Sequence, residues 1–279
     1  MNLIPLDKLK QDAHKQLAPV FGIRESKALL RALEEDLWDT PKTLLDGDDL
    51  TVWTGAIQRL LQHEPVAYIT GKAYFLHLVL KVNPRVLIPR PETETLVIEA
   101  IRQLKPIHSP RVLDIGTGSG CIALAIRSAF RECKVYGLDI DPLVLDVARE
   151  NAQEHRLDVE WLLADVLEEQ SWNNLPDALD MIISNPPYIL ESEKKYMSVS
   201  TLNYEPPQAL FSVDDPVRFY KVIAAFGLSH LKSGGRVIVE INEFMVEATM
   251  AVMAIPGYSQ PELIQDLSGK DRIISMVKL

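Results

Sequence analysis

The loop Asn185-Pro186-Pro187-Tyr188 carries the residue types best suited to chemistry in this sequence. It follows an apolar run at 181–183 that predicts a buried strand, and open α/β folds bind ligands in polar loops after such strands. The two prolines fix the backbone and remove two N–H donors, which leaves the loop carbonyls free to face outward. The Asn185 side-chain oxygen and the Pro186 carbonyl offer two acceptors to a planar –NH2 group, and the Tyr188 ring offers an apolar face. We therefore expect Asn185, Pro186 and Tyr188 to be catalytic, and residues 185–188 to bind an amide or a base amine.

A second polar loop joins the first strand of an alternating strand–helix region to its helix. Its glycines, Gly116, Gly118 and Gly120, permit backbone conformations closed to other residues and allow a ligand to approach closely. Their spacing is Gly-x-Gly-x-Gly, which differs from the Gly-x-Gly-x-x-Gly of dinucleotide-binding folds. Together with Thr117 and Ser119, these glycines are predicted to bind a cofactor.

Acidic residues at strand ends indicate which cofactor this is. Asp114 directly precedes the glycine loop, where it could face an ammonium group. Asp139 ends the second strand, where a carboxylate can accept hydrogen bonds from both ribose hydroxyls. Asp165, followed by Val166, ends the third strand and could lie beside an adenine, although helix capping is an alternative for Asp165. S-adenosylmethionine (SAM) has an ammonium, a sulfonium and a ribose but no phosphate, so we expect SAM as cofactor and S-adenosylhomocysteine as product.

The alternation of elements predicts how these loops are positioned. Strands are expected at 111–115, 134–139, 159–163, 179–184 and 236–241, and helices at 119–129, 142–155, 216–231 and 243–254. Two final strands, 258–266 and 272–278, form a hairpin around Ser268-Gly269-Lys270. An antiparallel pair that closes a parallel sheet is typical of class I methyltransferases. The predicted fold is therefore α/β, with a doubly wound, mostly parallel seven-stranded sheet over residues 91–279.

Two shorter regions precede this domain. Residues 1–65 carry apolar stripes at helical spacing, such as Leu6, Leu9, Ala13 and Leu17, which predicts a small helical bundle. Residues 66–90 are richer in β-forming types, with strands expected at 68–70 and 78–82 on either side of Gly71, so a β-hairpin linker is predicted. A helix should then begin at Pro91, with Glu92 and Glu94 favourable at its positive end.

Composition and charge limit the classes of protein. The chain has 279 residues, of which 47% are hydrophobic, enough for one large domain and a small one. The net charge of −10 argues against a protein that tracks nucleic-acid backbones, so no direct nucleic-acid contact is expected. Cys121 and Cys133 have no metal-binding spacing, and no metal is expected. Residues 1–15 lack the apolar core of a signal peptide, and no apolar run has the length of a membrane span, so we expect a cytoplasmic protein without membrane contact. A monomer is expected as well.

Taken together, the motifs resemble those of the release-factor glutamine methyltransferases, the PrmC/HemK family. The similarity runs from about Pro65 onward and is carried by residues 87–94, 113–125, 185–189, 204–206 with 209–210, and 266–272. Asn-Pro-Pro-Tyr alone also occurs in adenine-N6 methyltransferases. Its combination with Arg-Pro-Glu-Thr-Glu at 90–94 is highly specific for glutamine methyltransferases.

The resemblance implies transfer of a methyl group from SAM to the side-chain nitrogen of the glutamine in the Gly-Gly-Gln motif of class-1 peptide chain release factors. It also implies that the amino-terminal helical domain helps to hold the release factor. The family's cofactor positions map onto 116–120, Asp139, the Asp165-Val166 region and Asn185, and its substrate loop maps onto 185–188. Asn242 and Met245 depart from the family pattern, as does Phe211-Ser212, so no role is transferred to residues 240–245.

Three alternatives stay open at the level of sequence. The first is a glutamine methyltransferase that acts on a ribosomal protein, which the motifs do not separate from a release-factor enzyme. The second is an adenine-N6 methyltransferase, which would need phosphate contacts; Asp and Glu outnumber Lys and Arg within residues 1–80. The third is a binding module without catalysis, against which the intact 185–188 loop argues.

Overall fold

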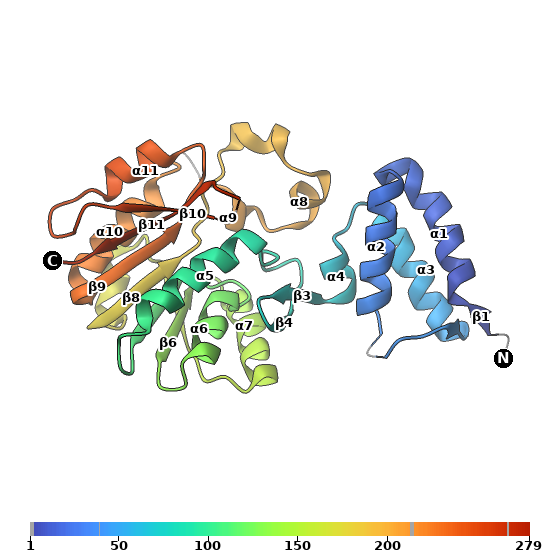
Figure 1. Cartoon of the computed structure of the whole chain (residues 1–279), viewed down its shortest axis with the longest axis horizontal. Helices are drawn as coiled ribbons and strands as arrows, with labels where there is room; N and C mark the ends of the chain where they lie inside the picture. The colour runs from blue at the N-terminus through green and yellow to red at the C-terminus, as the bar shows by residue number, and fades with distance from the viewer. Residues whose placement is uncertain (1–2, 39, 213–214, 267) are drawn as a thin grey trace. The chain divides into compact units, whose positions relative to one another are not determined.

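The structure, a computed structural model, describes residues 3–38, 40–212, 215–266 and 268–279. The chain forms two compact units (Figure 1). The smaller comprises Met1–Lys72 and Met197–Tyr204, and the larger comprises Ala73–Tyr196 and Glu205–Leu279. Of the 266–272 stretch, Leu267 lies outside the described residues.

A seven-stranded sheet with the order β10-β11-β9-β8-β5-β6-β7 forms the centre of the larger unit. Its strands are β5 (Arg111–Ile115), β6 (Lys134–Asp139), β7 (Glu160–Leu163), β8 (Leu179–Ser184), β9 (Leu231–Glu240), β10 (Glu262–Gln265) and β11 (Asp271–Val277). The five strands from β5 to β9 run parallel to one another, whereas β11 is antiparallel to both β9 and β10. The predicted doubly wound, mostly parallel fold is confirmed.

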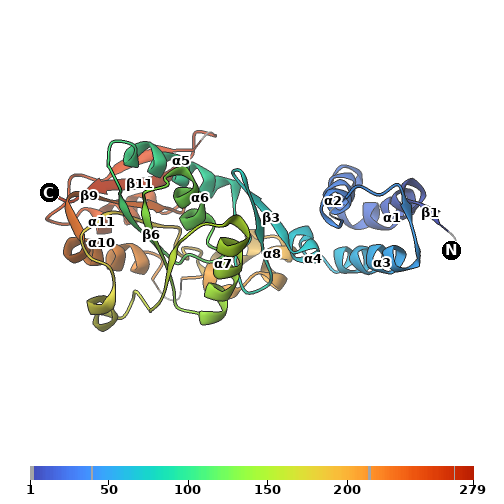
Figure 2. The same cartoon turned by 90° about the horizontal axis from the view of Figure 1, so that it is seen from below.

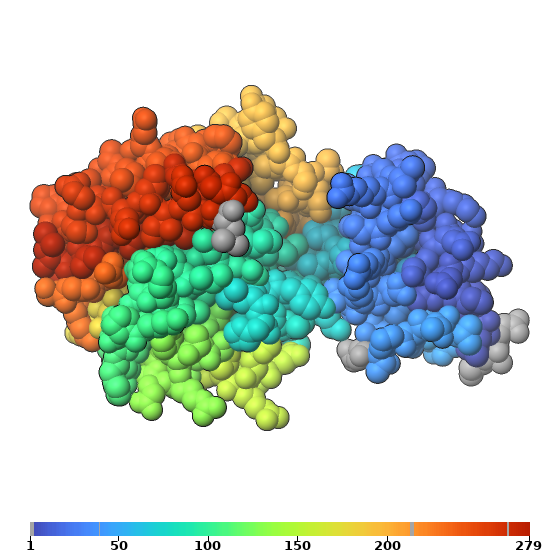
Figure 3. All heavy atoms as spheres, viewed as in Figure 1, coloured from blue at the N-terminus to red at the C-terminus, as the bar shows by residue number. Residues whose placement is uncertain are grey.

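Helices cover both faces of this sheet, because the buried strands are apolar on both sides. Val112 and Ile183 pack into one core with α5 (Pro91–Leu104), α6 (Cys121–Ala129) and α7 (Pro142–His155). Leu113 and Ile182 pack into the other core with α10 (Arg218–His230) and α11 (Val246–Met253). Figure 2 shows α10 and α11 across the sheet from α5 and α6, and Figure 3 shows α5 on the surface beside the carboxyl-terminal strands.

The strand order creates a switch point between β5 and β8. From β5 the chain moves outward through β6 to β7, and it then returns to the other side of β5 to form β8 and β9. The loops that leave β5 and β8 therefore diverge at the carboxyl edge of the sheet. Open α/β sheets bind ligands in the crevice at this position.

The region that was expected to be a hairpin linker differs from the prediction at its start. The strand predicted at 68–70 is wrong, because these residues belong to helix α4 (Val66–Thr70). The Pro65 carbonyl accepts from the backbone N–H groups of Tyr68 and Ile69, and Gly71 ends the helix with a φ of +73°. The two-stranded sheet lies further along, between β3 (Lys72–Phe75) and β4 (Leu78–Lys81).

The smaller unit is helical, as the apolar stripes predicted. It contains α1 (Leu6–Phe21), α2 (Ile23–Asp36), α3 (Gly47–Leu61), α4 and α8 (Val199–Tyr204), with a short pair of strands, β1 (Ile4–Pro5) and β2 (Leu44–Leu45). Leu17, Leu33 and Trp53 are buried in a core of its own. Tyr204 of α8 donates to the Gln62 carbonyl at 2.8 Å.

Three short segments complete the larger unit. The 3-10 turn η1 (Glu169–Asn174) follows β7, while η2 (Glu191–Tyr196) and α9 (Pro207–Leu210) follow β8. Helix α11 begins later than the predicted residue 243. The Asn242 side chain and carbonyl accept from the N–H groups of Phe244 and Met245, which forms a turn before the helix.

Candidate active site

A cavity of about 320 Å³ lies at the carboxyl edge of the sheet, at the switch point. Its walls come from the loops after β5, β6, β7 and β8 and from three further segments. The lining residues that bear on the argument are Gly116, Gly118, Asp139, Asp165, Val166, Asn185, Pro186 and Pro187. The structure therefore brings the glycine loop, two strand-end acids and the diproline loop to one cavity.

The glycine loop has the backbone geometry of a close-approach site. Gly116 and Gly118 have φ angles of +72° and +56°, which L-residues with side chains adopt only under strain. A Cβ atom added at either position would meet no protein atom within 4 Å. The loop is held from below, because the Leu138 carbonyl accepts from the N–H groups of Gly116 and Thr117. A flat ligand can therefore lie against this backbone without displacing a side chain.

Thr117 and Ser119, two of the predicted cofactor residues, are buried and are absent from the cavity wall. The Thr117 hydroxyl donates to Asp114 Oδ2 at 2.6 Å, and the Ser119 carbonyl accepts from the Asn151 side chain at 2.9 Å. Gly120 also lies outside the wall and stands at the start of α6. Thr117, Ser119 and Gly120 therefore support the glycine loop on the side away from the cavity.

Asp114 is fully buried, and its Oδ1 atom has no hydrogen-bond partner among the described residues. Burial raises the pKa of this carboxyl from 3.8 to about 7, and the hydrogen bond from Thr117 opposes that shift only in part. A buried carboxyl oxygen without a partner is costly unless a ligand supplies a donor, and the cost is greatest for the ionised form. Asp114, which was predicted to bind the cofactor, is itself absent from the cavity wall and contacts the glycine loop from behind, through Thr117. An ammonium group bound at the base of that loop would be the donor that its free oxygen lacks.

Asp139 and Asp165 present carboxylates to the cavity. Asp139 Oδ2 accepts from the Gly118 N–H at 3.0 Å, and burial raises the pKa of this acid. Asp165 Oδ1 accepts from the Leu167 N–H at 2.8 Å, and Val166 lines the wall beside it. Asp139 Oδ1 also accepts from the Asp141 N–H at 3.3 Å, so backbone donors hold both side chains in place at the cavity wall.

The diproline loop leaves β8, whose residues are all buried. Asn185, Pro186 and Pro187 line the cavity, whereas Tyr188 does not. The Tyr188 hydroxyl instead donates to Glu240 Oε1 at 3.0 Å, at the end of β9. Burial and the nearby Glu240 carboxyl together raise the pKa of Tyr188.

Two residues that were not predicted lie behind this loop. Asn185 Nδ2 donates to the Thr93 hydroxyl at 3.0 Å, and that hydroxyl donates to Glu240 Oε2 at 2.7 Å. Thr93 lies inside the 90–94 motif, where the sequence drew attention to the two flanking glutamates. Glu240 ends a strand just as Asp139 does, so the strand-end rule could have found it.

The flanking glutamates have other surroundings. Glu94 Oε1 accepts from the Leu76 N–H at 2.7 Å, and Glu92 is exposed on the first turn of α5. Neither lines the cavity. Pro91 occupies the start of α5 as predicted.

A buried ion pair connects two segments of the cavity wall. Glu205 is 3% exposed and accepts from Arg90 Nη2 at 2.5 Å and from the Ile88 N–H at 3.2 Å. The segment before Ile88 and the segment after Glu205 both contribute to the wall. The pair therefore holds two walls that are far apart in sequence. Phe211 and Ser212, which depart from the family pattern, also line the cavity.

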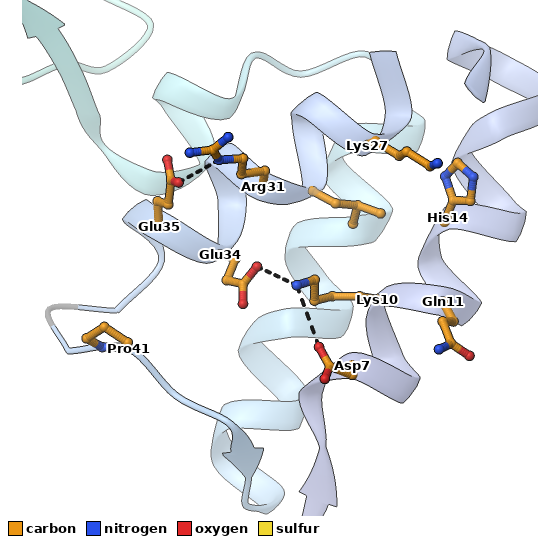
Figure 4. Close-up of a pocket in the computed structure, with 10 residues that line it drawn as sticks. Asp7, Lys10, Gln11, His14, Lys27, Arg31, Glu34, Glu35 and Pro41 are labelled. Atoms are coloured by element: carbon orange, nitrogen blue, oxygen red, sulfur yellow. Dashed lines mark hydrogen bonds and ion pairs between the residues drawn. The ribbon is translucent and has the colours of Figure 1, made fainter. Parts of the chain in front are cut away.

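A second hollow, of about 840 Å³, lies in the helical unit between α1 and α2 (Figure 4). Its charged groups largely pair with one another. Lys10 contacts Asp7 and Glu34, and Arg31 contacts Glu35 at 2.8 Å. Such neutralised surface pairs provide no nucleophile or acid–base arrangement, so the chemistry is assigned to the cavity at the sheet edge.

Within the described ranges, no group of His, Cys, Asp and Glu could hold a metal ion. None of the helices described for this chain has both the length and the apolar character needed to cross a membrane.

The fold and the cavity define a class I methyltransferase, and comparison with known proteins agrees. The model of the methyltransferase small domain matches residues 93–213. A methyltransferase structure from Pyrococcus furiosus aligns over 81% of this chain and 98% of its own, with a TM-score of 0.52 and 19% identity, which supports the fold alone.

Sequence relatives define the family more closely. A release factor glutamine methyltransferase from Flavobacterium psychrophilum is 32% identical over 272 residues, covering 93% of this chain and 94% of its own. One from Lactococcus lactis subsp. lactis is 40% identical over 229 residues, covering 82% and 83%. The chain belongs to the release factor glutamine methyltransferase family, as its motifs predicted.

Proposed function

We propose that this protein transfers a methyl group from SAM to the side-chain nitrogen of the glutamine in the Gly-Gly-Gln motif of class-1 peptide chain release factors. The observation that carries the proposal is one cavity shared by a glycine loop and by the acceptors of Asn185 and Pro186. The product of the donor is S-adenosylhomocysteine. The alternatives, a ribosomal-protein glutamine or a base amine, become arms of the test below.

The residues present fit SAM. Gly116 and Gly118 offer an open backbone surface, Asp139 offers a carboxylate for ribose hydroxyls, and Asp165 with Val166 forms a wall suited to the adenine. Asp114 has the unpartnered oxygen that an ammonium group would satisfy, directly or through water. SAM contributes a methyl group activated by its sulfonium.

The contribution of the protein to the reaction is to orient the amide nitrogen of the substrate. An amide nitrogen is a weak nucleophile because its lone pair is delocalised into the carbonyl. Asn185 Oδ1 and the Pro186 carbonyl would each accept one amide hydrogen, which orients the nitrogen and favours the positive charge that develops on it. No general base is required, because water or a carbonyl can take the proton after transfer. Fixed acceptors of this kind lower the barrier by holding the reacting groups in line.

The helical unit is assigned to holding the protein substrate, with no direct contact to nucleic acid. The protein would act in the cytoplasm as a monomer. This role predicts that Lys27→Glu, at the rim of the hollow in Figure 4, raises KM for an intact release factor. The same change should leave kcat/KM for a short Gly-Gly-Gln peptide unaltered.

The decisive experiment is mass spectrometry of a release factor incubated with the protein and SAM. A single added methyl on the glutamine of Gly-Gly-Gln is expected, and it should form much more slowly with Asn185→Ala. Parallel incubations with ribosomal proteins and with adenine-containing oligonucleotides test the alternatives. Methylation of either of these, with the release factor unmodified, would reject the proposal.

A further inference from the structure

A continuous hydrogen-bond chain runs behind the diproline loop, through three elements of the larger unit. It begins at Asn185 after β8, passes through the Thr93 hydroxyl on α5, and ends on the Glu240 carboxyl at the end of β9. Thr93 is 3% exposed and Glu240 is 1% exposed. Tyr188 closes the chain from the other side, because its hydroxyl donates to the second oxygen of Glu240.

The donor and acceptor types of these groups fix the direction in which the protons of this hydrogen-bond chain are donated. A carboxylate can only accept, so the single hydroxyl proton of Thr93 goes to Glu240. The Thr93 oxygen can then only accept, and the group that it accepts from is the Asn185 –NH2. With its nitrogen held on Thr93, the Asn185 amide has its oxygen left for another donor. An amide hydrogen of a substrate requires that oxygen.

We infer that Thr93 and Glu240 are positioning residues that hold the Asn185 amide with its oxygen toward the substrate nitrogen. The inference rests on the proposed function, and it assigns to Glu240 a role that the sequence did not. If the Asn185 amide were turned around, it would present its –NH2 group to the –NH2 group of the substrate, and two donors repel each other. Neither Thr93 nor Glu240 lines the cavity, so both act through Asn185.

The surroundings of Glu240 are built to keep it in place. Its backbone carbonyl accepts from the Tyr220 hydroxyl at 3.0 Å, which fixes the end of β9. Burial raises the pKa of the Glu240 carboxyl, while the hydrogen bonds from Thr93 and Tyr188 and the charge of Arg272, on the neighbouring strand, oppose that rise. Arg272 is itself held by Asp266 at 3.3 Å. The carboxylate thus has two hydroxyl donors and a nearby cation.

If Thr93 only supported the fold, its substitution would add a separate loss of activity to that of Asn185→Ala. A double-mutant cycle therefore distinguishes a structural role of Thr93 from a positioning role. Thr93→Val keeps the shape of the side chain and removes the hydroxyl, while Thr93→Ser retains the hydroxyl and serves as the matched control. Thr93→Val should lower kcat on the order of tenfold or more, because a misoriented acceptor no longer aligns the nucleophile. SAM affinity should stay unchanged, and Thr93→Ser should restore most of kcat. In an Asn185→Ala background, Thr93→Val should cause no further loss, since residues that act as a unit are not additive.

A spectroscopic readout is independent of turnover. The side-chain N–H signals of Asn185, identified by their loss in Asn185→Ala, should shift in Thr93→Val and stay near the wild-type position in Thr93→Ser. Near-normal kcat in Thr93→Val, or losses that multiply in the double variant, would overturn the inference and leave the proposed function intact. A wild-type protein that methylates no release factor would overturn both.

Discussion

Asp114→Asn is expected to stabilise the SAM-free protein more at pH 8 than at pH 5. Burial raises the pKa of Asp114 from 3.8 to about 7 in the folded protein. Between these two values the unfolded chain ionises while the folded chain stays protonated, so the free energy of unfolding falls as the pH rises. At about 1.4 kcal/mol per pH unit, this cost is about 2 kcal/mol at pH 5 and about 4 kcal/mol at pH 8.

The asparagine does not titrate, so the stability difference between variant and wild type should shift in favour of the variant by about 2 to 3 kcal/mol from pH 5 to pH 8. The new –NH2 group takes the place of the unpartnered Oδ1 and itself lacks an acceptor, which costs about 1 to 3 kcal/mol. That cost is the same at both pH values and cancels in the comparison.

Urea unfolding of both proteins at both pH values measures this shift, and calorimetric titration measures SAM affinity. Affinity should fall about tenfold or more in Asp114→Asn, because a hydrogen bond to a charged group contributes about 1.5 to 3 kcal/mol. Asp146→Asn, an exposed carboxyl on α7, is the control and should show no such pH dependence. An Asp114→Asn stability difference that is equal at pH 5 and pH 8 would refute the reasoning from burial. Unchanged SAM affinity would refute the ammonium contact.

Asn185→Ala should lower kcat for release-factor methylation on the order of a hundredfold with little change in the Kd of SAM, which single-turnover kinetics and calorimetry would test. The kcat of the wild type should decline toward acid pH as Glu240 becomes protonated. Because burial raises the pKa of Glu240, this decline should begin at a higher pH than for an ordinary glutamate. A kcat that stays constant toward acid pH would contradict this prediction. The charged and titratable groups around Glu240 are Arg272, Glu92, Tyr188, Tyr220 and Cys121. Gly137→Ala should destabilise the fold by about 1 to 3 kcal/mol, because its Cβ would lie 2.4 Å from the Trp161 ring. Gly55→Ala, in α3 with no atom within 4 Å of the added Cβ, should be neutral or stabilising in the same unfolding assay.

Local pattern was sufficient to find most elements of the sheet and the loops that follow them. The strands predicted at 111–115, 134–139 and 179–184 have the observed bounds. Short apolar runs followed by polar turns have few alternatives in an alternating sequence, because both faces of a parallel strand must be buried. For the same reason, the amino-acid sequence was enough to place Asp139 and Asn185 at one edge of the sheet.

Short segments without a clear period were decided by tertiary structure. Residues 68–70 are β-rich in type but helical, since Pro65 and Gly71 provide a start and an end for one helical turn. The direction of side chains also could not be predicted from the sequence. Spacing placed Thr117 and Ser119 on the glycine loop, but packing in the folded protein turns them away from the cavity.

The sequence by itself determined the class of fold and the places of the diproline loop and the strand-end acids along the chain, because these depend on residues close together in sequence. The roles of these residues in binding SAM and the amide remain predictions. The partners of Asn185 were decided only by the tertiary structure. Thr93 and Glu240 come from different elements, and their approach depends on the order of strands in the sheet and on the rotation of α5 above it. Long-range hydrogen bonds between buried groups have no periodicity in the sequence, so the fold has to form before they can be identified.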